Sequence, residues 1–237
     1  GMLQALGVKL LDAAGHELAR GGAPLAQLAR IDASGIDPRL AQCQIEVACD
    51  VDNPLTGPRG ASAIFGPQKG ATPEMVQSLD AGLKHFAQII LRDLGVDVDA
   101  VAGAGAAGGM GAAMMAFLKG QLRPGCEIIA KAVGLDAAVQ GADLVVTGEG
   151  RIDHQTIFGK TPFGVATVAK RHGVPVIGIA GGLGTNAHVV HDHGIDAIFS
   201  VLSSICTLDD ALADAEHNVR SAARNMAAVL AIGQRMG

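Results

Sequence analysis

Three short apolar runs decide the fold of this chain: DLVVT at 143–147, PVIGIA at 175–180 and DAIFSV at 196–201. The segments between and after them have helical patterns: 162–172, 186–193 and 208–232. Continuous apolar runs that alternate with helices are typical of parallel strands covered on both faces. The last hundred residues therefore predict a β-α-β-α-β-α unit with a parallel sheet, and the fold class is α/β.

This predicted sheet is narrow, because doubly wound sheets usually have five or six strands. Three strands leave an apolar edge open to solvent. Either the chain self-associates through that edge, or further strands come from sequence that is missing here. We therefore expect a homo-oligomer or an incomplete sheet.

The first half of the chain combines a long helix with glycine-rich loops. Thr72 is expected as the N-cap of the helix, with Pro73 at its first position, Glu74 in its first turn and Gly95 after its end. Apolar residues recur on one face of this helix: Met75, Leu79, Leu83, Phe86 and Ile90. Further expected elements are a hairpin at 9–18, a strand within 42–51, a long loop at 52–73, a glycine-rich loop and helix at 103–118, and a helix near 127–139.

Composition narrows the class of protein. Of 237 residues, 49% are hydrophobic and 17% charged, which is too apolar for a disordered chain. The net charge is −5 and the basic residues are scattered, so nucleic acid is not expected as a partner. No apolar run reaches the ~18 residues of a membrane helix, so no membrane is expected either. The four cysteines form no CxxC pair and are expected to be reduced thiols of a cytoplasmic protein.

The best candidate site directly follows the DLVVT run, where Gly148-Glu149-Gly150-Arg151-Ile152-Asp153 begins. Ligands of open parallel sheets bind at the carboxyl ends of strands. Two carboxylates beside an arginine suit a phosphorylated or carboxylated ligand, with oxygens left for Mg²⁺. The alternative is a solvated turn with an internal ion pair. Glu149 and Asp153 are candidate catalytic residues, and Arg151 is a candidate substrate-binding residue.

Three further clusters carry candidate residues in the first half of the chain. Asp50 and Asp52 come at the end of the 42–51 strand, as candidate catalytic residues, and Asn53 follows as a candidate binding residue; an Asx-turn before Pro54 is the alternative. Lys69, between Gly66 and Gly70, suits anion binding. In the glycine-rich loop, Gly105, Gly108 and Gly109 suit backbone contacts to an anion or close helix packing.

Other chemistries have weaker support. The GxGxxG match at 103–108 does not clearly follow a strand and has no acidic residue at a strand end about 20 residues on, so a nicotinamide-dependent oxidoreductase is a remote alternative. His188, His191 and His193 do not share one helix face, which disfavours a metal site. The sequence has no GxSxG nucleophile elbow and no HExxH zinc motif. Carboxylates, cations and glycine loops remain, and these suit phosphoryl transfer.

Several long stretches resemble one family, the bacterial glycerate kinases of the glycerate 2-kinase type. The resemblance rests on CDVDNPLTGPRGASAIFGPQKGA at 49–71, GAGAAGGMGAAMMAFL at 103–118, LVVTGEGRIDHQTIFGKTPFGVA at 144–166 and PVIGIAG at 175–181. It implies ATP-dependent, Mg²⁺-dependent phosphorylation of D-glycerate to 2-phosphoglycerate. By carry-over of these motifs, Asp50, Asp52, Asn53, Lys69, Glu149, Arg151 and Asp153 would line the family's cleft, with Asp50, Asp52 and Glu149 as candidate Mg²⁺ ligands.

The resemblance also implies a domain organisation. Residues 135–237 would form the C-terminal part of a Rossmann-like domain, and 1–134 much of a second α/β domain inserted into it. Family members start with a strand and further acidic, glycine-rich loops that this sequence lacks, so we expect a truncated C-terminal portion. The main alternative to an active kinase is therefore a non-catalytic remnant or ligand-binding module.

Overall fold

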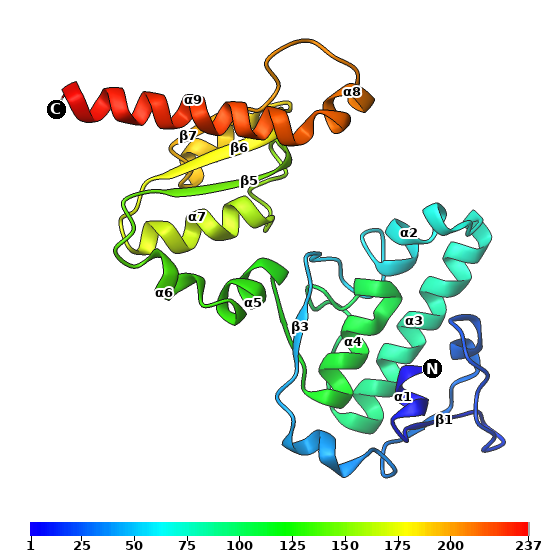
Figure 1. The fold of residues 1–237 in the computed structure, drawn as a ribbon. Helices are drawn as coiled ribbons and strands as arrows, with labels where there is room; N and C mark the ends of the chain where they lie inside the picture. The colour runs from blue at the N-terminus through cyan, green and yellow to red at the C-terminus, as the bar shows by residue number, and fades with distance from the viewer. Residues whose placement is uncertain (237) are drawn as a thin grey trace. The chain divides into compact units, whose positions relative to one another are not determined.

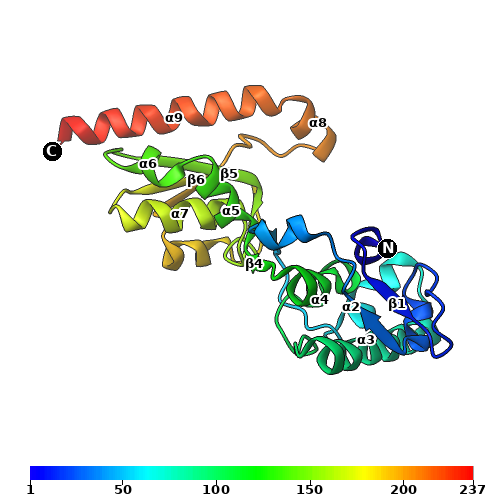
Figure 2. The same ribbon diagram turned by 90° about the horizontal axis from the view of Figure 1, so that it is seen from below.

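The computed structural model describes residues 1–236, which divide into two compact units. The first unit comprises residues 1–125 and the second begins at Cys126 (Figure 1; Figure 2). Among the described residues, no helix has both the length and the apolar character that a membrane crossing requires. None of the four cysteines, which all lie within the described residues, forms a disulfide bond.

The first unit is built around two helices, α3 (Pro73–Leu94) and α4 (Ala106–Leu118). Its remaining elements are α1 (Met2–Ala5), β1 (Lys9–Leu11), η1 (Ala23–Gln27), β2 (Arg30–Asp32), η2 (Pro38–Gln42), β3 (Glu46–Ala48), α2 (Ala61–Phe65), η3 (Pro67–Lys69) and β4 (Gln121–Arg123), where η denotes a 3₁₀-helix. Strands β1 and β2 pair antiparallel, and β3 and β4 pair parallel.

Helix α3 confirms its sequence prediction at both ends. The Thr72 side chain accepts a hydrogen bond from the Met75 N–H at 3.3 Å, and Gly95 ends the helix in the left-handed conformation at φ 72°. The expected apolar face is buried at Leu83, Phe86 and Ile90, but its first residue, Met75, is 55% exposed. Local capping and periodicity together therefore define this element.

The hairpin predicted at 9–18 is present but short, with Gly15 in its turn at φ 84° and Leu11 paired antiparallel with Glu17. The Leu18 N–H donates to the Leu10 carbonyl at 2.8 Å, and the Asp12 N–H donates to the His16 carbonyl at 2.9 Å. Strand β1 also pairs with β2. One prediction in this unit needs correction. The loop expected at 52–73 contains two short helices, α2 and η3, because Ile64 and Phe65 belong to a helical turn.

The second unit contains the parallel sheet. Its elements are α5 (Gly125–Ala132, which starts at the unit boundary), α6 (Leu135–Val139), β5 (Val145–Ile152), α7 (Thr161–Arg171), β6 (Val176–Leu183), η4 (Ala187–His193), β7 (Ala197–Ser200), α8 (Leu208–Ala213) and α9 (Ala215–Met236). The strands lie in the order β5-β6-β7 and are all parallel, with Val145 opposite Val176 and Ile177 opposite Ala197. The three-stranded parallel sheet is thus confirmed.

The two faces of this sheet differ, which corrects the expectation that both are covered. Along β6, buried residues such as Val176 and Ala180 alternate with half-buried ones such as Ile177 and Ile179. Helix α7 packs against the buried face. On the other side, among residues 215–236 of α9, only Met226 is buried.

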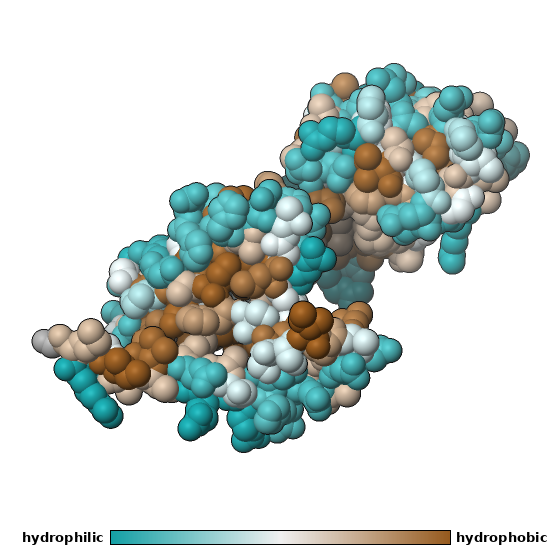
Figure 3. Space-filling model, turned by 90° about the horizontal axis from the view of Figure 1, so that it is seen from above, coloured by the Kyte–Doolittle hydropathy of each residue, from teal (hydrophilic) through white to brown (hydrophobic). Residues whose placement is uncertain are grey.

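Apolar surface is consequently exposed in the second unit. Val146, Phe199 and Val219 are exposed, at 47%, 38% and 43% of their surface. Figure 3 shows apolar residues gathered in a band along the unit that carries the C-terminus. A single amphipathic helix with one buried residue does not cover a sheet face.

Candidate functional site

The candidate site of the second unit lies on β5 and the loop after it. The sequence predicted that this strand ends at Thr147, but β5 continues to Ile152. The strand continues because Gly148, Glu149, Arg151 and Ile152 pair with β6. The two strands approach closely, since a Cβ on Gly148 would lie 2.4 Å from the Ile179 carbonyl oxygen. Glu149 and Arg151 are therefore strand residues, and Asp153 is the first residue after the strand.

A buried hydroxyl joins the two carboxylate residues. Thr156 is fully buried, and its hydroxyl donates to Glu149 Oε1 at 2.6 Å. The Thr156 hydroxyl oxygen also accepts the backbone N–H of Asp153 at 3.1 Å. The Asp153 side chain in turn accepts the Gln155 N–H at 2.8 Å. The loop 153–156 thus closes on itself and holds the Glu149 carboxylate through Thr156.

Positive charge lies beside both carboxylates. Lys160 Nζ is 4.0 Å from Glu149 Oε2 and 3.8 Å from Asp153 Oδ1, and Arg151 Nε is 3.5 Å from Asp153 Oδ2. The Glu149 and Asp153 side chains are only 18% and 13% exposed, so water screens these pairs less than it screens surface pairs. We call Glu149, Arg151, Asp153, Thr156 and Lys160 the β5 cluster.

The cluster sets the charge state of Asp153. The pKa of Asp153 is held below its ordinary value, first by the hydrogen bond from the Gln155 N–H. Partial burial opposes this shift, and the positive charges of Lys160, His154 and Arg151 add to it. Asp153 is therefore an ionised carboxylate at neutral pH, able to accept hydrogen bonds or bind a cation.

A cavity of about 310 Å³ borders the cluster at Glu149. The other lining residues lie on β5 and β6, directly after β7, and on α9: Val146, Thr147, Gly148, Ile179, Ala180, Gly181, Val201 and Val219. The lining is mainly apolar, with Glu149 as its one ionisable side chain. Few polar groups in an apolar concavity are typical of small-molecule sites.

The candidate residues of the first unit have other partners. Asp50 Oδ1 accepts the Gly125 N–H at 2.7 Å, next to the start of α5. Asp52 pairs with Arg59 at 2.8 Å, and both side chains are largely exposed. The Asn53 side chain donates to the Arg59 carbonyl at 2.8 Å. These bonds shape the loop after β3, and Lys69 is exposed at the end of η3.

The glycine-rich loop packs against that same loop. The Gly105 N–H donates to the Asn53 carbonyl at 3.0 Å, and a Cβ on Gly105 would lie 2.3 Å from the Pro54 oxygen. Ala107, Gly108 and Gly109 have positive φ values of 51°, 75° and 98°. With Met110, they line a second cavity of about 200 Å³ near the start of the chain. No strand occurs in the described segment 95–105, so the GxGxxG match lacks the context of a dinucleotide site.

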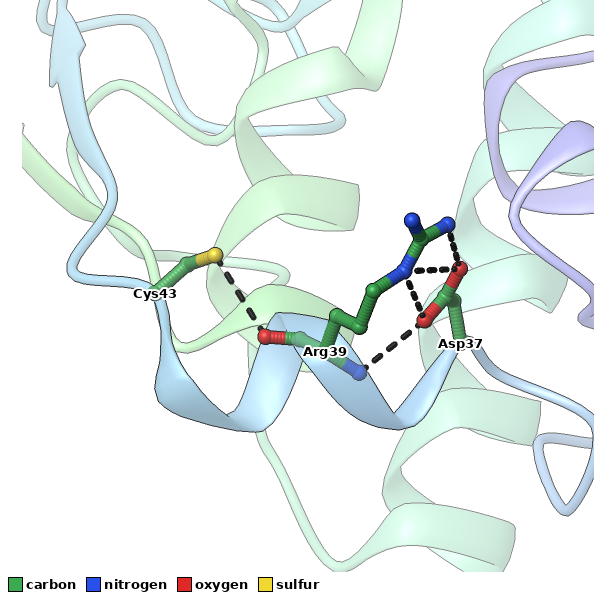
Figure 4. Close-up of polar contacts among 3 residues, drawn as sticks. All are labelled: Asp37, Arg39 and Cys43. Carbon is green, nitrogen blue, oxygen red and sulfur yellow. Dashed lines mark hydrogen bonds and ion pairs between the residues drawn. The ribbon is translucent and has the colours of Figure 1, made fainter.

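Outside the β5 cluster, several charged, histidine and cysteine side chains form hydrogen bonds with residues close to them in the sequence. Asp37 caps η2 by accepting the Arg39 N–H and pairs with the Arg39 guanidinium, while the Cys43 thiol donates to the Arg39 carbonyl (Figure 4). His191 and His193 contact the carbonyls of Ile195 and Val189. Within residues 1–236, no three His, Cys, Asp or Glu side chains gather into a metal-binding group.

Sequence reasoning missed Thr156 and Lys160. Both lie inside the quoted DHQTIFGK segment, and the spacing of Asp153 and Thr156 is the available signal. An Asp followed three residues later by a Thr is a pattern in which side chains and backbone N–H groups bond within one turn.

Comparisons with known proteins point to one family over nearly the whole chain. The model of the glycerate kinase family matches residues 1–231. Glycerate 2-kinase of Escherichia coli K12 is 58% identical over 99% of this chain and 62% of its own length. Glycerate kinase of Bacillus subtilis 168 is 50% identical over 100% of this chain and 62% of its own length.

Solved structures agree. The crystal structure of a provisionally assigned glycerate kinase 2 from Salmonella typhimurium LT2 has a TM-score of 0.85 and 59% sequence identity. The match covers 99% of this chain and 61% of that chain. The chain thus spans about three fifths of the length of the relatives it matches. With the family model matching all but its last few residues, the chain belongs to the glycerate kinase family.

Proposed function

We propose that this chain acts in the ATP-dependent phosphorylation of D-glycerate to 2-phosphoglycerate. The observation that carries the proposal is its 58% identity, over 99% of its length, to a protein named glycerate 2-kinase. The mixed α/β architecture and the β5 cluster are compatible with that activity.

The β5 cluster supplies the groups that phosphoryl transfer needs. Catalysis of this reaction depends mostly on positioning and on stabilising charge. Arg151 and Lys160 suit the glycerate carboxylate or the phosphates of ATP, because both present N–H donors beside a half-buried site. Glu149 or Asp153 suits the acceptance of the proton from the glycerate hydroxyl.

Magnesium fits the donor set of this cluster. The carboxylate oxygens of Glu149 and Asp153 are the ligand type that Mg²⁺ prefers, and Lys160 already balances their charge from one side. When bound with ATP, Mg²⁺ would neutralise negative charge on the phosphates.

Asp50 and Asp52 remain proposed alternatives as ligands or catalytic groups, with Asn53, Lys69, Gly105, Gly108 and Gly109 as proposed binding residues. The cytoplasmic location stays a prediction.

The product identifies the reaction most directly. The chain is incubated with D-glycerate, ATP and Mg²⁺, and the products are resolved by ³¹P NMR against authentic 2- and 3-phosphoglycerate. We expect the resonance of 2-phosphoglycerate. Exclusive formation of 3-phosphoglycerate would show that the 2-hydroxyl of glycerate is not the group phosphorylated. Hydrolysis of ATP without formation of a phosphoglycerate would show that glycerate is not the phosphoryl acceptor.

A further inference from the structure

The Thr156 hydroxyl both donates and accepts a hydrogen bond within the β5 cluster. It accepts the Asp153 N–H at 3.1 Å and donates to Glu149 Oε1 at 2.6 Å. A hydroxyl has a single proton, so the donated bond to Glu149 leaves it none for another acceptor. The accepted bond fixes the oxygen relative to the loop. The direction of the donated bond is thereby determined by the backbone.

Burial makes this arrangement rigid. Thr156 is fully buried, and the Glu149 side chain is 18% exposed. The last torsion of a glutamate side chain is intrinsically broad, so an unsupported carboxylate rotates freely. A short bond to a buried donor restricts that rotation, since water cannot reach the Thr156 hydroxyl to compete for it.

The hydrogen bond also gives the two carboxylate oxygens of Glu149 different surroundings. Oε1 is occupied by Thr156, while Oε2 lies 4.0 Å from Lys160 Nζ. Oε2 accepts no hydrogen bond from Thr156 and is therefore the oxygen that we assign to a substrate proton or a cation. Catalytic groups must be held within fractions of an ångström of the reacting atoms, which requires partners that do not themselves touch the substrate.

We propose that Thr156 is the positioning residue that orients Glu149 for phosphoryl transfer, an inference that rests on the proposed function. It acts through Glu149 and makes no contact with substrate. Its contribution belongs to the chemical step, because the orientation of a proton acceptor affects the transition state more than the bound ground state.

The kinetic test compares Thr156→Val with Thr156→Ser. Valine keeps the shape and removes the hydroxyl, whereas serine keeps the hydroxyl. We expect Thr156→Val to lower kcat about tenfold to a hundredfold, as loss of an orienting partner typically does, with KM for glycerate nearly unchanged. Thr156→Ser should recover most of kcat. Thr167→Val is the matched control, because the exposed Thr167 hydroxyl bonds only the Phe163 carbonyl of its own helix.

A second readout does not depend on turnover. Glu149→Ala, Thr156→Val and the double variant are compared in thermal unfolding. If the two side chains are bonded, the Tm losses are less than additive. Additive losses would overturn the inference, as would an unchanged kcat in Thr156→Val, a rise in KM alone, or Thr156→Ser being as impaired as Thr156→Val.

These readouts separate the inference from the proposed function. Absence of turnover in the unsubstituted chain refutes the proposed function. The unfolding comparison then decides by itself whether Thr156 holds Glu149.

Discussion

Asp153 and Asp52 show how differently one residue type behaves in two environments. Asp153 is mostly buried, accepts a backbone N–H and lies near two cationic side chains. Asp52 is 75% exposed and pairs with Arg59, which is 67% exposed. An exposed ion pair contributes at most about 1 kcal/mol, because solvent screens it. The surroundings of Asp153 hold its pKa below the ordinary value, so the fold controls the charge state of this carboxylate.

The variant Lys160→Met tests how positive charge affects the protonation of Asp153. Removing this ammonium should raise the pKa of Asp153, because the positive charge favours the ionised carboxylate. The pKa should stay below its ordinary value, since the Gln155 N–H bond, the largest cause of the shift, remains. Any loss of activity caused by protonation of Asp153 then begins at a higher pH. A ¹³C NMR titration of the Asp153 carboxyl measures the change.

Lys170→Met is the matched control for that titration. Lys170 pairs with Asp196 at 2.7 Å, so its removal should leave the titration of Asp153 unchanged. An unaltered Asp153 titration in Lys160→Met, or an equal shift in both variants, would contradict the electrostatic account of the cluster.

At the scale of elements, glycines in α4 and the loop before it permit a close approach of two backbone segments. Gly105 adopts an ordinary φ of −76°, yet a Cβ there would overlap the Pro54 carbonyl. Gly108 has φ 75°, but a Cβ at this position would meet nothing within 4 Å beyond its chain neighbours. The two glycines are thus required for different reasons, one for space and one for backbone conformation.

Alanine substitutions should separate the two reasons. Gly108→Ala should cost about 1–2 kcal/mol of unfolding free energy, the cost of a left-handed residue with a Cβ. Gly105→Ala should cost about 3 kcal/mol, because the loop at 53–55 must move. Urea denaturation of both variants measures the difference. Equal losses, or a larger loss for Gly108→Ala, would show that the loop does not depend on this contact.

Sequence patterns predicted elements well where local chemistry defines them. The ends of α3 were predictable because Thr72 and Gly95 are local capping signals. Strand β4 was missed because so short a strand carries no periodicity, and it exists through pairing with β3, which is distant in the sequence. Glu149, Arg151 and Asp153 could be singled out because they follow the DLVVT run, although Glu149 and Arg151 proved to lie within β5. Thr156 could not, because only the fold turns its hydroxyl toward Glu149.

At the scale of the molecule, the second unit presents more apolar surface than its own elements cover. Val146 and Phe199 on the sheet, and Val219 on α9, are each more than a third exposed. At about 25 cal/mol per Å², a few hundred Å² of such surface corresponds to several kcal/mol. This is comparable with the stability of a whole domain. We therefore propose that the chain self-associates through this surface.

Size-exclusion chromatography with light scattering tests the association. We expect a dimer or larger species, and we expect Val219→Asp to shift it toward monomer because a charge would enter an apolar contact. Val133→Asp is the control, since Val133 is 69% exposed and lies between α5 and α6. A thermally stable monomer at micromolar concentration would contradict the proposal.

Steady-state turnover of the chain with D-glycerate, Mg²⁺ and ATP, followed by coupled ADP release, tests the proposed kinase activity. We expect ADP release that depends on D-glycerate and falls about a hundredfold or more in Glu149→Gln, the loss typical for removal of a general base. No glycerate-dependent ADP release at high protein concentration, or full activity in Glu149→Gln, would contradict this proposal.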